Sequence, residues 1–129
     1  MASDVGPLRI GHADWELHNL EWAGTVPVAV HDWDSLAIRT EVGIAGAAAA
    51  VHASASGGPV AASVAETDRF LTAHQEVRPS WSADQTELAW AAGLWVLAYN
   101  AKKEAAGGGA GYLAHLRPEV AERLRLAGA

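Results

Sequence analysis

The sequence contains no cysteine, so it can hold neither a disulfide framework nor a thiolate metal site. It also lacks an excess of basic residues, because 9 Lys and Arg stand against 15 Asp and Glu and leave a formal net charge of −6. A nucleic-acid surface normally needs a basic face, so this balance argues against nucleic acid as a partner. The same balance is compatible with a neutral or cationic small ligand.

Long hydrophobic runs are missing as well. The longest apolar run, residues 88–99, is too short to cross a bilayer. The first fifteen residues have neither a basic region nor an apolar core, so they do not read as a signal peptide. We therefore expect a soluble cytoplasmic protein that does not contact membranes. Half of the 129 residues are apolar, which suits one domain with a packed core.

The pattern of residues changes near residue 38. Before it, short β-rich runs predict strands over 7–11, 19–23 and 26–32, with Gly24 and Thr25 closing a hairpin between the last two. After it, apolar spacing predicts helices near 40–54, 60–77 and 82–105, and two short helical pieces around Pro118. This order predicts one α+β domain over 1–129, with a small β-hairpin region at 1–38 and a helical subdomain at 39–129.

Three local signals set the expected helix starts. Thr40 is a suitable N-cap for the first helix, and Pro59 suits the first turn of the second. Ser82 and Gln85 have the spacing of a capping box and predict the start of the longest helix. Because that helix is apolar nearly all round between residues 88 and 99, we expect it to be central and buried.

Two polar clusters carry the chemistry. His12, Asp14 and Asn19 have the spacing H-x-D-x(4)-N, which is also the spacing of the kinase catalytic loop. Phosphoryl transfer needs a carboxylate within hydrogen-bond reach of the attacking hydroxyl, and hard oxygen ligands for magnesium. Asp32 follows Asn19 by thirteen residues, which leaves room for two short strands and a turn. The Asp-Trp-Asp segment at 32–34 makes the pattern more specific than the first loop alone.

With these residues, the stretch from Ile10 to about Ala50 resembles the aminoglycoside phosphotransferase and choline kinase family. That family has a signature loop H-G-D-L-H-x-x-N, then a hairpin, then I-D-W-E or a close variant. The resemblance implies a kinase-like C-terminal lobe that uses ATP and Mg²⁺ to transfer phosphate to a hydroxyl group of a small acceptor.

The resemblance also implies a role for each matched residue. Asp14 is implied as the catalytic base, and His12 as its catalytic-loop partner with a buried, hydrogen-bonded scaffold role. Asn19 and Asp32 are implied as the cofactor-binding residues that hold magnesium, and Asp34 as a support of the metal site. The helices after residue 38 would then shape the acceptor pocket.

The chain departs from the family pattern at several positions. Ala13 replaces the usual Gly, Trp15 the usual Leu, and His31 an aliphatic residue. In the family a β-rich N-terminal lobe carries the loop that covers the phosphates and a lysine that pairs with the nucleotide. The only lysines here, Lys102 and Lys103, lie near the end of the longest predicted helix. We therefore expect a catalytic lobe without its nucleotide lobe, and no ATP turnover by this chain alone.

Two other functions use the same features. In the first, a His/Asp site holds a transition metal for hydrolysis, with five candidate ligands: His12, Asp14, His18, His31 and Asp32. In the second, the chain is a non-enzymatic lobe that acts as a dimerisation or partner-binding domain. The second function predicts an apolar surface with incomplete cover around Leu8, Ile10, Trp22 and Val28, and a missing N-terminal lobe predicts the same surface. Because such a surface tends to be buried by a partner, we expect a homodimer. The helical face of Glu66, Asp68 and Glu76 should stay in water.

Overall fold

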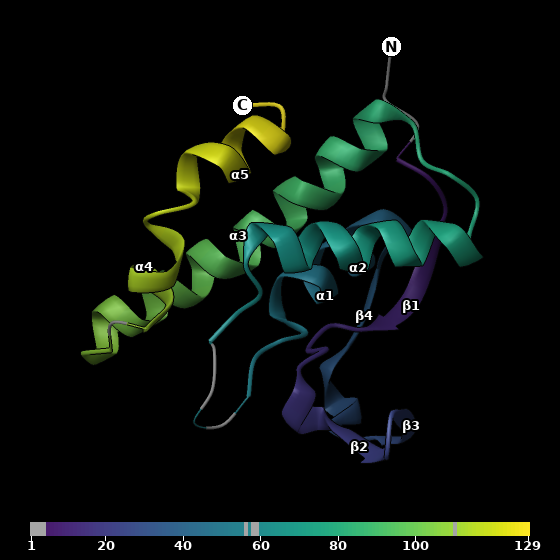
Figure 1. Cartoon of the computed structure of the whole chain (residues 1–129), viewed down its shortest axis with the longest axis horizontal. Coiled ribbons are helices and arrows are strands. Elements are labelled where there is room, and N and C mark those ends of the chain that lie inside the picture. The colour runs from purple at the N-terminus through teal and green to yellow at the C-terminus, as the bar shows by residue number, and fades with distance from the viewer. Residues whose placement is uncertain (1–4, 56, 58–59, 110) are drawn as a thin grey trace.

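A computed structural model of the chain describes residues 5–55, 57, 60–109 and 111–129. Figure 1 shows an α+β arrangement, with two small β ribbons on one side of a group of helices. The strands are β1 (Leu8–His12), β2 (Leu20–Ala23), β3 (Val26–Val30) and β4 (Leu36–Thr40). The helices are α1 (Glu41–Val51), α2 (Val64–Val77), α3 (Ala83–Gly107), α4 (Gly111–Leu116) and α5 (Val120–Leu126). The expected fold class is therefore observed.

The strands form two antiparallel ribbons. β2 pairs with β3, and the expected two-residue turn closes this hairpin, with Gly24 at a φ of 64° that suits glycine. β1 pairs with β4, so that Ile10 lies opposite Ile38. The sequence-based prediction missed β4, although Leu36 and Ile38 alternate with Ala37 and Arg39 as strand residues do.

β3 ends at Val30, two residues earlier than predicted. Asp32 has a φ of 63° and a ψ of 48°, which is a left-handed conformation that a strand cannot contain. A short 3-10 turn, η2 (Trp33–Ser35), then leads into β4. The chain therefore reverses direction at Asp32, and this reversal brings β4 back alongside β1.

The helix starts follow their caps. Thr40 caps α1 as predicted, because its Oγ1 accepts a hydrogen bond of 3.2 Å from the Gly43 N–H. The predicted capping box at Ser82 and Gln85 is also present. The predicted start of α2 near residue 60 is wrong, because Ser63 and Glu66 form a capping box that begins the helix at Val64. Pro59, the expected first-turn residue, lies outside the described residues.

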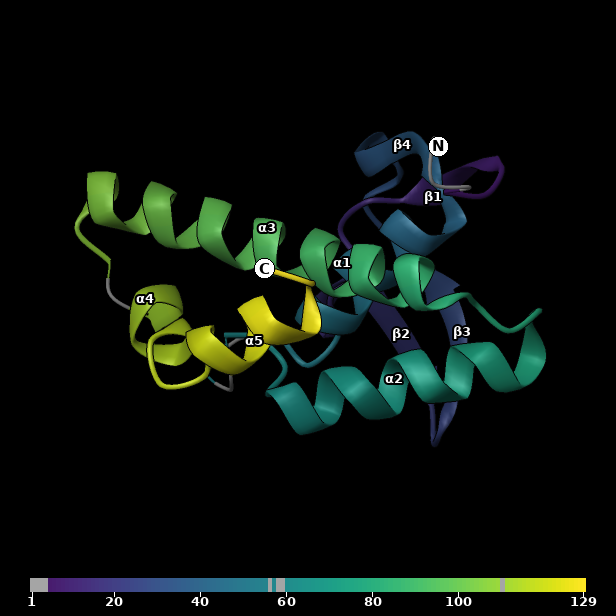
Figure 2. The same ribbon diagram turned by 90° about the horizontal axis from the view of Figure 1, so that it is seen from above.

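Helix α1 lies between α2 and α3 (Figure 2). A Cβ atom on Gly46 of α1 would overlap the backbone of Ala89 of α3, and one on Gly93 of α3 would lie 2.9 Å from the Gly46 carbonyl oxygen. The two helices therefore touch backbone to backbone, which only small residues permit. Ala49 and Ala50 of α1 are fully buried beside this contact.

Helix α3 was expected to be buried on all sides, but one of its sides is exposed. Trp90 is only 3% exposed and belongs to the core, whereas Trp95 is 56% exposed on another side of the same helix. Arg123 of α5 is also buried, and its Nη2 donates a 2.7 Å hydrogen bond to the Ala62 carbonyl oxygen. None of the helices in the described ranges combines the length and the apolar character that crossing a membrane requires.

We expect the substitution Gly46→Ala to destabilise the protein by about 1–3 kcal/mol, the usual cost of overpacking, because neither backbone can move away alone. Gly107→Ala is the matched control, since it is also a helical glycine and an added Cβ would meet nothing within 4 Å. The control should be neutral or stabilise the helix slightly. Urea unfolding of both variants checks this, and equal stability of the two would contradict the backbone contact.

Candidate functional site

The two polar clusters of the sequence are joined in the structure by main-chain hydrogen bonds. The Ala13 N–H donates to the Ser35 carbonyl oxygen at 2.8 Å, and the His31 N–H donates to the Asn19 carbonyl oxygen at 2.8 Å. Residues 12–19, called here the catalytic-type loop, and residues 31–35, called the Asp32 turn, therefore form one hydrogen-bonded unit. The hairpin β2–β3 connects them and projects away from the helices (Figure 1).

His12 holds this unit together from inside. Its side chain is buried, and its Nε2 lies 2.8 Å from the His31 carbonyl oxygen. A carbonyl can only accept, so Nε2 carries the proton, and Nδ1 is then free to accept the 3.2 Å hydrogen bond from the Asp14 N–H. The ring also meets the edges or faces of Trp15 and Trp33 at centroid distances of 6.1 and 5.6 Å. Both ring nitrogens are thus occupied, which is the geometry of a scaffold residue.

Asn19 fixes the carboxylate of Asp14. Asn19 is buried, and its Nδ2 donates to the Asp14 main-chain oxygen at 2.9 Å and to its Oδ2 at 3.0 Å. The Asn19 Oδ1 accepts no hydrogen bond from any residue in the part of the chain that is described. The loop therefore orients one carboxylate and keeps one amide oxygen available.

Asp32 and Asp34 form a pair of exposed carboxyl groups beside the loop. The pKa of Asp34 is raised, because its carboxyl group is hydrogen-bonded to that of Asp32 and is repelled by its charge. Asp32 is the one non-glycine residue with positive φ among those described, and the Ser35 Oγ lies 3.4 Å from its Oδ2. A residue held in this conformation costs free energy, and such residues gather at functional sites.

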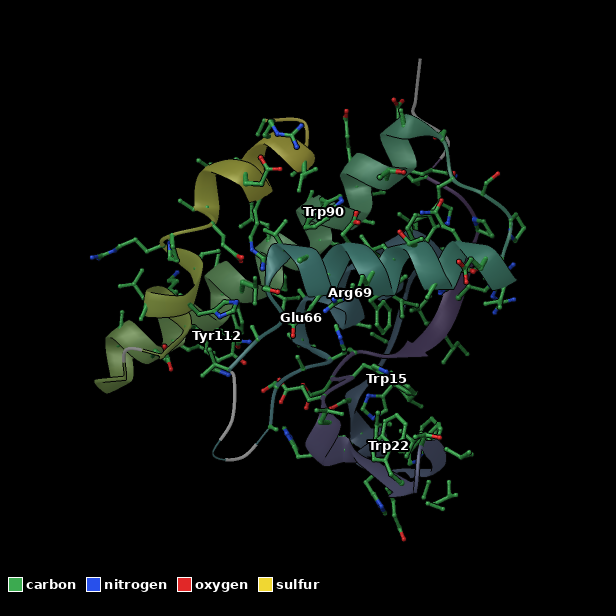
Figure 3. All side chains as sticks on the ribbon, in the orientation of Figure 1. Trp15, Trp22, Glu66, Arg69, Trp90 and Tyr112 are labelled. Atoms are coloured by element: carbon green, nitrogen blue, oxygen red, sulfur yellow. The ribbon has the colours of Figure 1, made fainter. Side chains whose placement is uncertain are left out.

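A third group of polar residues, which the sequence did not single out as part of the site, borders the same loop. The Leu17 N–H donates a 3.1 Å hydrogen bond to the Ser54 carbonyl oxygen, so the loop is tied to the segment after α1. The side chains of Glu16 and Tyr112 both lie close enough to that of Ser54 for it to lower their pKa values. Tyr112 projects from α4 (Figure 3), so a helix near the C-terminus reaches the catalytic-type loop.

In this third group, the pKa values of Glu16 and Tyr112 are both raised. Burial raises the pKa of Glu16, and the nearby charge of Asp14 raises it further, while His18, whose Nδ1 lies 3.2 Å from Glu16 Oε2, opposes the shift. Burial also raises the pKa of the Tyr112 phenol, with added contributions from the charges of Glu16 and Asp14. The Asp14 carboxylate therefore faces a part of the protein in which negative charge is already disfavoured.

The candidate ligands of a transition-metal hydrolase do not come together. Among residues 5–55, 57, 60–109 and 111–129, no three His, Asp or Glu side chains are grouped as metal ligands. His12 has no free ring nitrogen, and the nearest ionic partners of His18 and His31 are Glu16 and Glu21. The described residues therefore do not show the grouped ligands that the hydrolase hypothesis predicts.

The apolar residues that were expected to lack cover do lack it. Leu8 and Ile10 of β1 are 64% and 73% exposed, and Trp22 and Val28 of the hairpin are 44% and 56% exposed. Ile38, opposite Ile10, is 68% exposed as well, so one face of the β1–β4 ribbon is open. Asp68 and Glu76 on α2 are exposed, as expected for a solvated helix face, and Glu66 is partly buried by its capping role.

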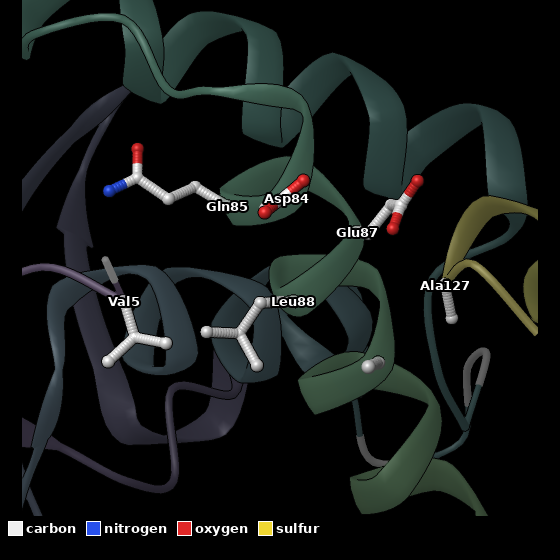
Figure 4. A pocket seen from close by; sticks show the side chains of 7 residues that line it. Val5, Asp84, Gln85, Glu87, Leu88 and Ala127 are labelled. Carbon is white, nitrogen blue, oxygen red and sulfur yellow. The ribbon is translucent and has the colours of Figure 1, made fainter. Parts of the chain in front are cut away.

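A separate cleft of about 410 Å³ lies at the start of α3 (Figure 4). Its walls include Val5, Leu88 and Ala127, with the carboxylates of Asp84 and Glu87 at its edge. None of the residues matched to the kinase-type pattern lines it, so it is not part of the candidate site.

Comparison of the chain with models of known protein families, with curated proteins and with solved structures returned no match.

We expect His12→Leu to destabilise the protein by about 1–2 kcal/mol, because it removes the partner of the His31 carbonyl and of the Asp14 N–H, both of which are partly buried. His31→Gln is the control, since the side chain of His31 is 59% exposed and its main-chain carbonyl stays in place. The control should change stability by less than about 0.5 kcal/mol. Urea unfolding measures both, and a harmless His12→Leu would show that the loop does not depend on this ring.

The raised pKa of Glu16 predicts that Glu16→Gln gains stability and that this gain depends on pH. Above the folded-state pKa, wild type keeps a partly buried charge that the unfolded chain exposes, so the variant should be more stable at pH 7. As the pH falls through that pKa, wild-type Glu16 becomes protonated and the advantage of the variant should vanish.

The control variant, Glu122→Gln, should change the stability at neutral pH in the opposite direction. The pKa of Glu122 is lowered by its hydrogen bond with Arg125, so Glu122→Gln should lose stability at neutral pH, and that loss should shrink as the pH falls. Unfolding of the three proteins between pH 4 and pH 7, about the range in which carboxylates titrate, compares the two signs. A Glu16→Gln variant that is less stable than wild type at pH 7 would refute the expected burial effect.

Proposed function

We propose that this chain is the catalytic lobe of a small-molecule phosphotransferase, which transfers phosphate from ATP to a hydroxyl group of its acceptor with the help of Mg²⁺. The observation that carries the proposal is the hydrogen-bonded unit of the catalytic-type loop and the Asp32 turn. In it Asn19 orients the Asp14 carboxylate, and His12 links the loop to the segment that bears Asp32.

The roles follow from what each group can do. The Asp14 carboxylate accepts a hydrogen bond, and then the proton, from the acceptor hydroxyl as that oxygen attacks the phosphate. One hydrogen bond from the Asn19 amide restricts the rotation of the Asp14 carboxylate, and a second holds the Asp14 main chain, which favours a single attack geometry. His12 contributes by position alone, since both of its ring nitrogens are engaged. In phosphoryl transfer this kind of positioning supplies most of the catalysis.

The donor set fits magnesium. Mg²⁺ prefers oxygen ligands, takes only a few from the protein and keeps several waters, so it does not need three grouped carboxylates. The free Oδ1 of Asn19 and the carboxylates of Asp32 and Asp34 are donors of this kind. The repulsion that raises the pKa of Asp34 is what a nearby cation would relieve. When bound, the ion would neutralise charge on the phosphate oxygens.

The open apolar face favours a second candidate, a lobe that binds a partner. Leu8, Ile10 and Ile38 together expose a face of the kind that other proteins cover with a domain or a second subunit. A nucleotide-binding lobe would cover this face in the phosphotransferase, whereas a second copy of the chain would cover it in a non-enzymatic dimer. The two candidates therefore differ in whether the Asp14 and Asp32 carboxylates have any chemical role.

Paramagnetic broadening of amide signals by Mn²⁺, a common substitute for Mg²⁺, tests the metal site directly. We expect broadening centred on residues 14, 19 and 32–34, and a loss of affinity of about tenfold in Asp32→Asn, because that change removes a charged ligand. Asp68→Asn on α2 is the control, since Asp68 is an exposed aspartate that no role is assigned to. Broadening centred elsewhere, or unchanged in Asp32→Asn, would contradict the proposal.

Activity is tested with a nucleotide-binding lobe supplied in trans, because the resemblance implies that such a lobe carries the groups that hold ATP. We expect turnover of ATP only in the mixture, and a loss of about 10²–10⁴-fold in Asp14→Asn, the range for removal of a general base. Robust ATP turnover by the chain alone would show that this dependence is wrong. Zinc-dependent hydrolysis without ATP would favour the hydrolase function instead.

A further inference from the structure

A second cleft, beside β1, has no role in the proposed phosphotransfer. It has a volume of about 440 Å³ and lies between β1 and the helices α1 and α2. Its apolar lining includes Ile10, Trp15, Ile44 and Phe70, and Ala45 and Ala48 leave the space open because their side chains are short. Cavities of this size, lined mainly by apolar groups with a few polar ones, are typical of small-molecule sites.

One end of the cleft is charged. Arg9, Arg78 and His74 all converge there on a single carboxylate, that of Glu41. The separations are 3.6 Å from Arg9 Nε, 3.3 Å from Arg78 Nε and 3.5 Å from His74 Nε2. Two guanidinium groups and one carboxylate leave one formal positive charge even when His74 is neutral. This excess stands out in a chain whose net charge is −6.

The donors at this end are not satisfied by the protein. None of the three contacts with Glu41 has the geometry of a hydrogen bond, and His74 Nε2 is buried with no hydrogen-bond partner among the described residues. The Nη nitrogens of Arg78 make no hydrogen bond to any residue in the described ranges, and those of Arg9 make a single long one of 3.5 Å to the Leu8 carbonyl oxygen. A buried ring nitrogen without a partner is uncommon in folded proteins and calls for an explanation such as a ligand. The two arginine side chains are more than half exposed, so their Nη groups are accessible to such a ligand.

We propose that this cleft binds a small amphipathic anion, a molecule with an apolar body and one carboxylate. The body would lie against Ile44, Phe70 and Trp15, and the carboxylate would accept hydrogen bonds from the Nη groups of Arg9 and Arg78 while Glu41 stays beside their Nε atoms. Guanidinium groups bind carboxylates through two parallel N–H donors, which the free Nη atoms supply. This site goes beyond the phosphotransferase proposal, since it uses neither Asp14, Asn19 nor Asp32.

The cleft shares a wall with the catalytic-type loop. His12 and Trp15 both border it, and these residues belong to the loop that carries Asp14. A ligand in the cleft therefore contacts the scaffold of the loop without reaching its carboxylates. Occupancy would hold the ring of Trp15 in place, and through it the ring of His12.

The test compares three ligands that share a ten-carbon chain: decanoate, decan-1-ol and decyltrimethylammonium. Each is titrated into the full chain while amide chemical shifts are recorded. We expect saturable shifts with decanoate at Gly11, Ala45 and Ala48, and much weaker binding of the alcohol and the cation. If the alcohol or the cation binds as tightly as decanoate, the proposed specificity for an anion is wrong. If decanoate does not bind at concentrations up to about 1 mM, the proposed site is wrong.

Two variants and a control locate the binding. Arg78→Gln should weaken decanoate binding by about fivefold, the usual size of an exposed charge contribution. Ile10→Glu should weaken it at least as much, because it places a like charge in the lining, and Ile10 is exposed enough for the fold to tolerate the change. Arg125→Gln, which removes an exposed ion-paired arginine on α5, should leave binding unchanged. Shifts that lie outside the cleft, or binding that Arg78→Gln does not weaken, would overturn the proposal.

Discussion

The backbone contact between α1 and α3 is the constraint on which the rest of the structure depends. Gly46 and Gly93 let the two helices approach until no Cβ fits between them. α1 thereby becomes the central helix, with α3 on one side and α2 on the other. β1 in turn packs on α1 through Gly11, where an added Cβ would lie 2.7 Å from the Ile44 side chain. The position of the catalytic-type loop, which begins at the end of β1, follows from this chain of close contacts.

The polar clusters near His12 and Asp32 are two halves of one unit, and that unit is built mainly from backbone groups. His12 bonds to a carbonyl, Ala13 bonds to a carbonyl, and Asn19 bonds to the main chain of Asp14 as well as to its carboxylate. Such an arrangement tolerates changes in the side chains around it. The main-chain hydrogen bonds of the loop therefore do not depend on the side chains of Ala13 and His31.

The parts of the fold that were predicted correctly have local causes. The caps at Thr40 and Ser82 and the turn at Gly24 each depend on residues within four positions of one another. The Ser63 and Glu66 capping box has the same local signature, but Pro59 also suits a first helical turn, so the sequence contains two competing start signals for α2. β4 was missed because its strand pattern is only five residues long and its partner, β1, lies far away in the sequence.

The site shows the same division between local and distant causes. The spacing of His12, Asp14 and Asn19 is local, and the structure joins these three residues by hydrogen bonds. Tyr112, Ser54 and Glu16 come from three segments that are distant in the sequence, so no spacing rule could reveal that they lie near one another. The one local signal is Glu16 itself, a carboxylate two residues after Asp14, and its burial raises its pKa.

Charge is separated across β1, and this separation connects the two proposed sites. Asp14, Asp32 and Asp34 lie beyond the C-terminal end of the strand, whereas Arg9, with Arg78 beside it, lies at the charged end of the cleft. A cation is attracted to the first place and an anion to the second, so ligands of the two sites do not compete for the same groups. They do share the rings of His12 and Trp15, which stand between them. If both sites are occupied, any coupling between them must pass through the packing of those two rings, because no charged group belongs to both.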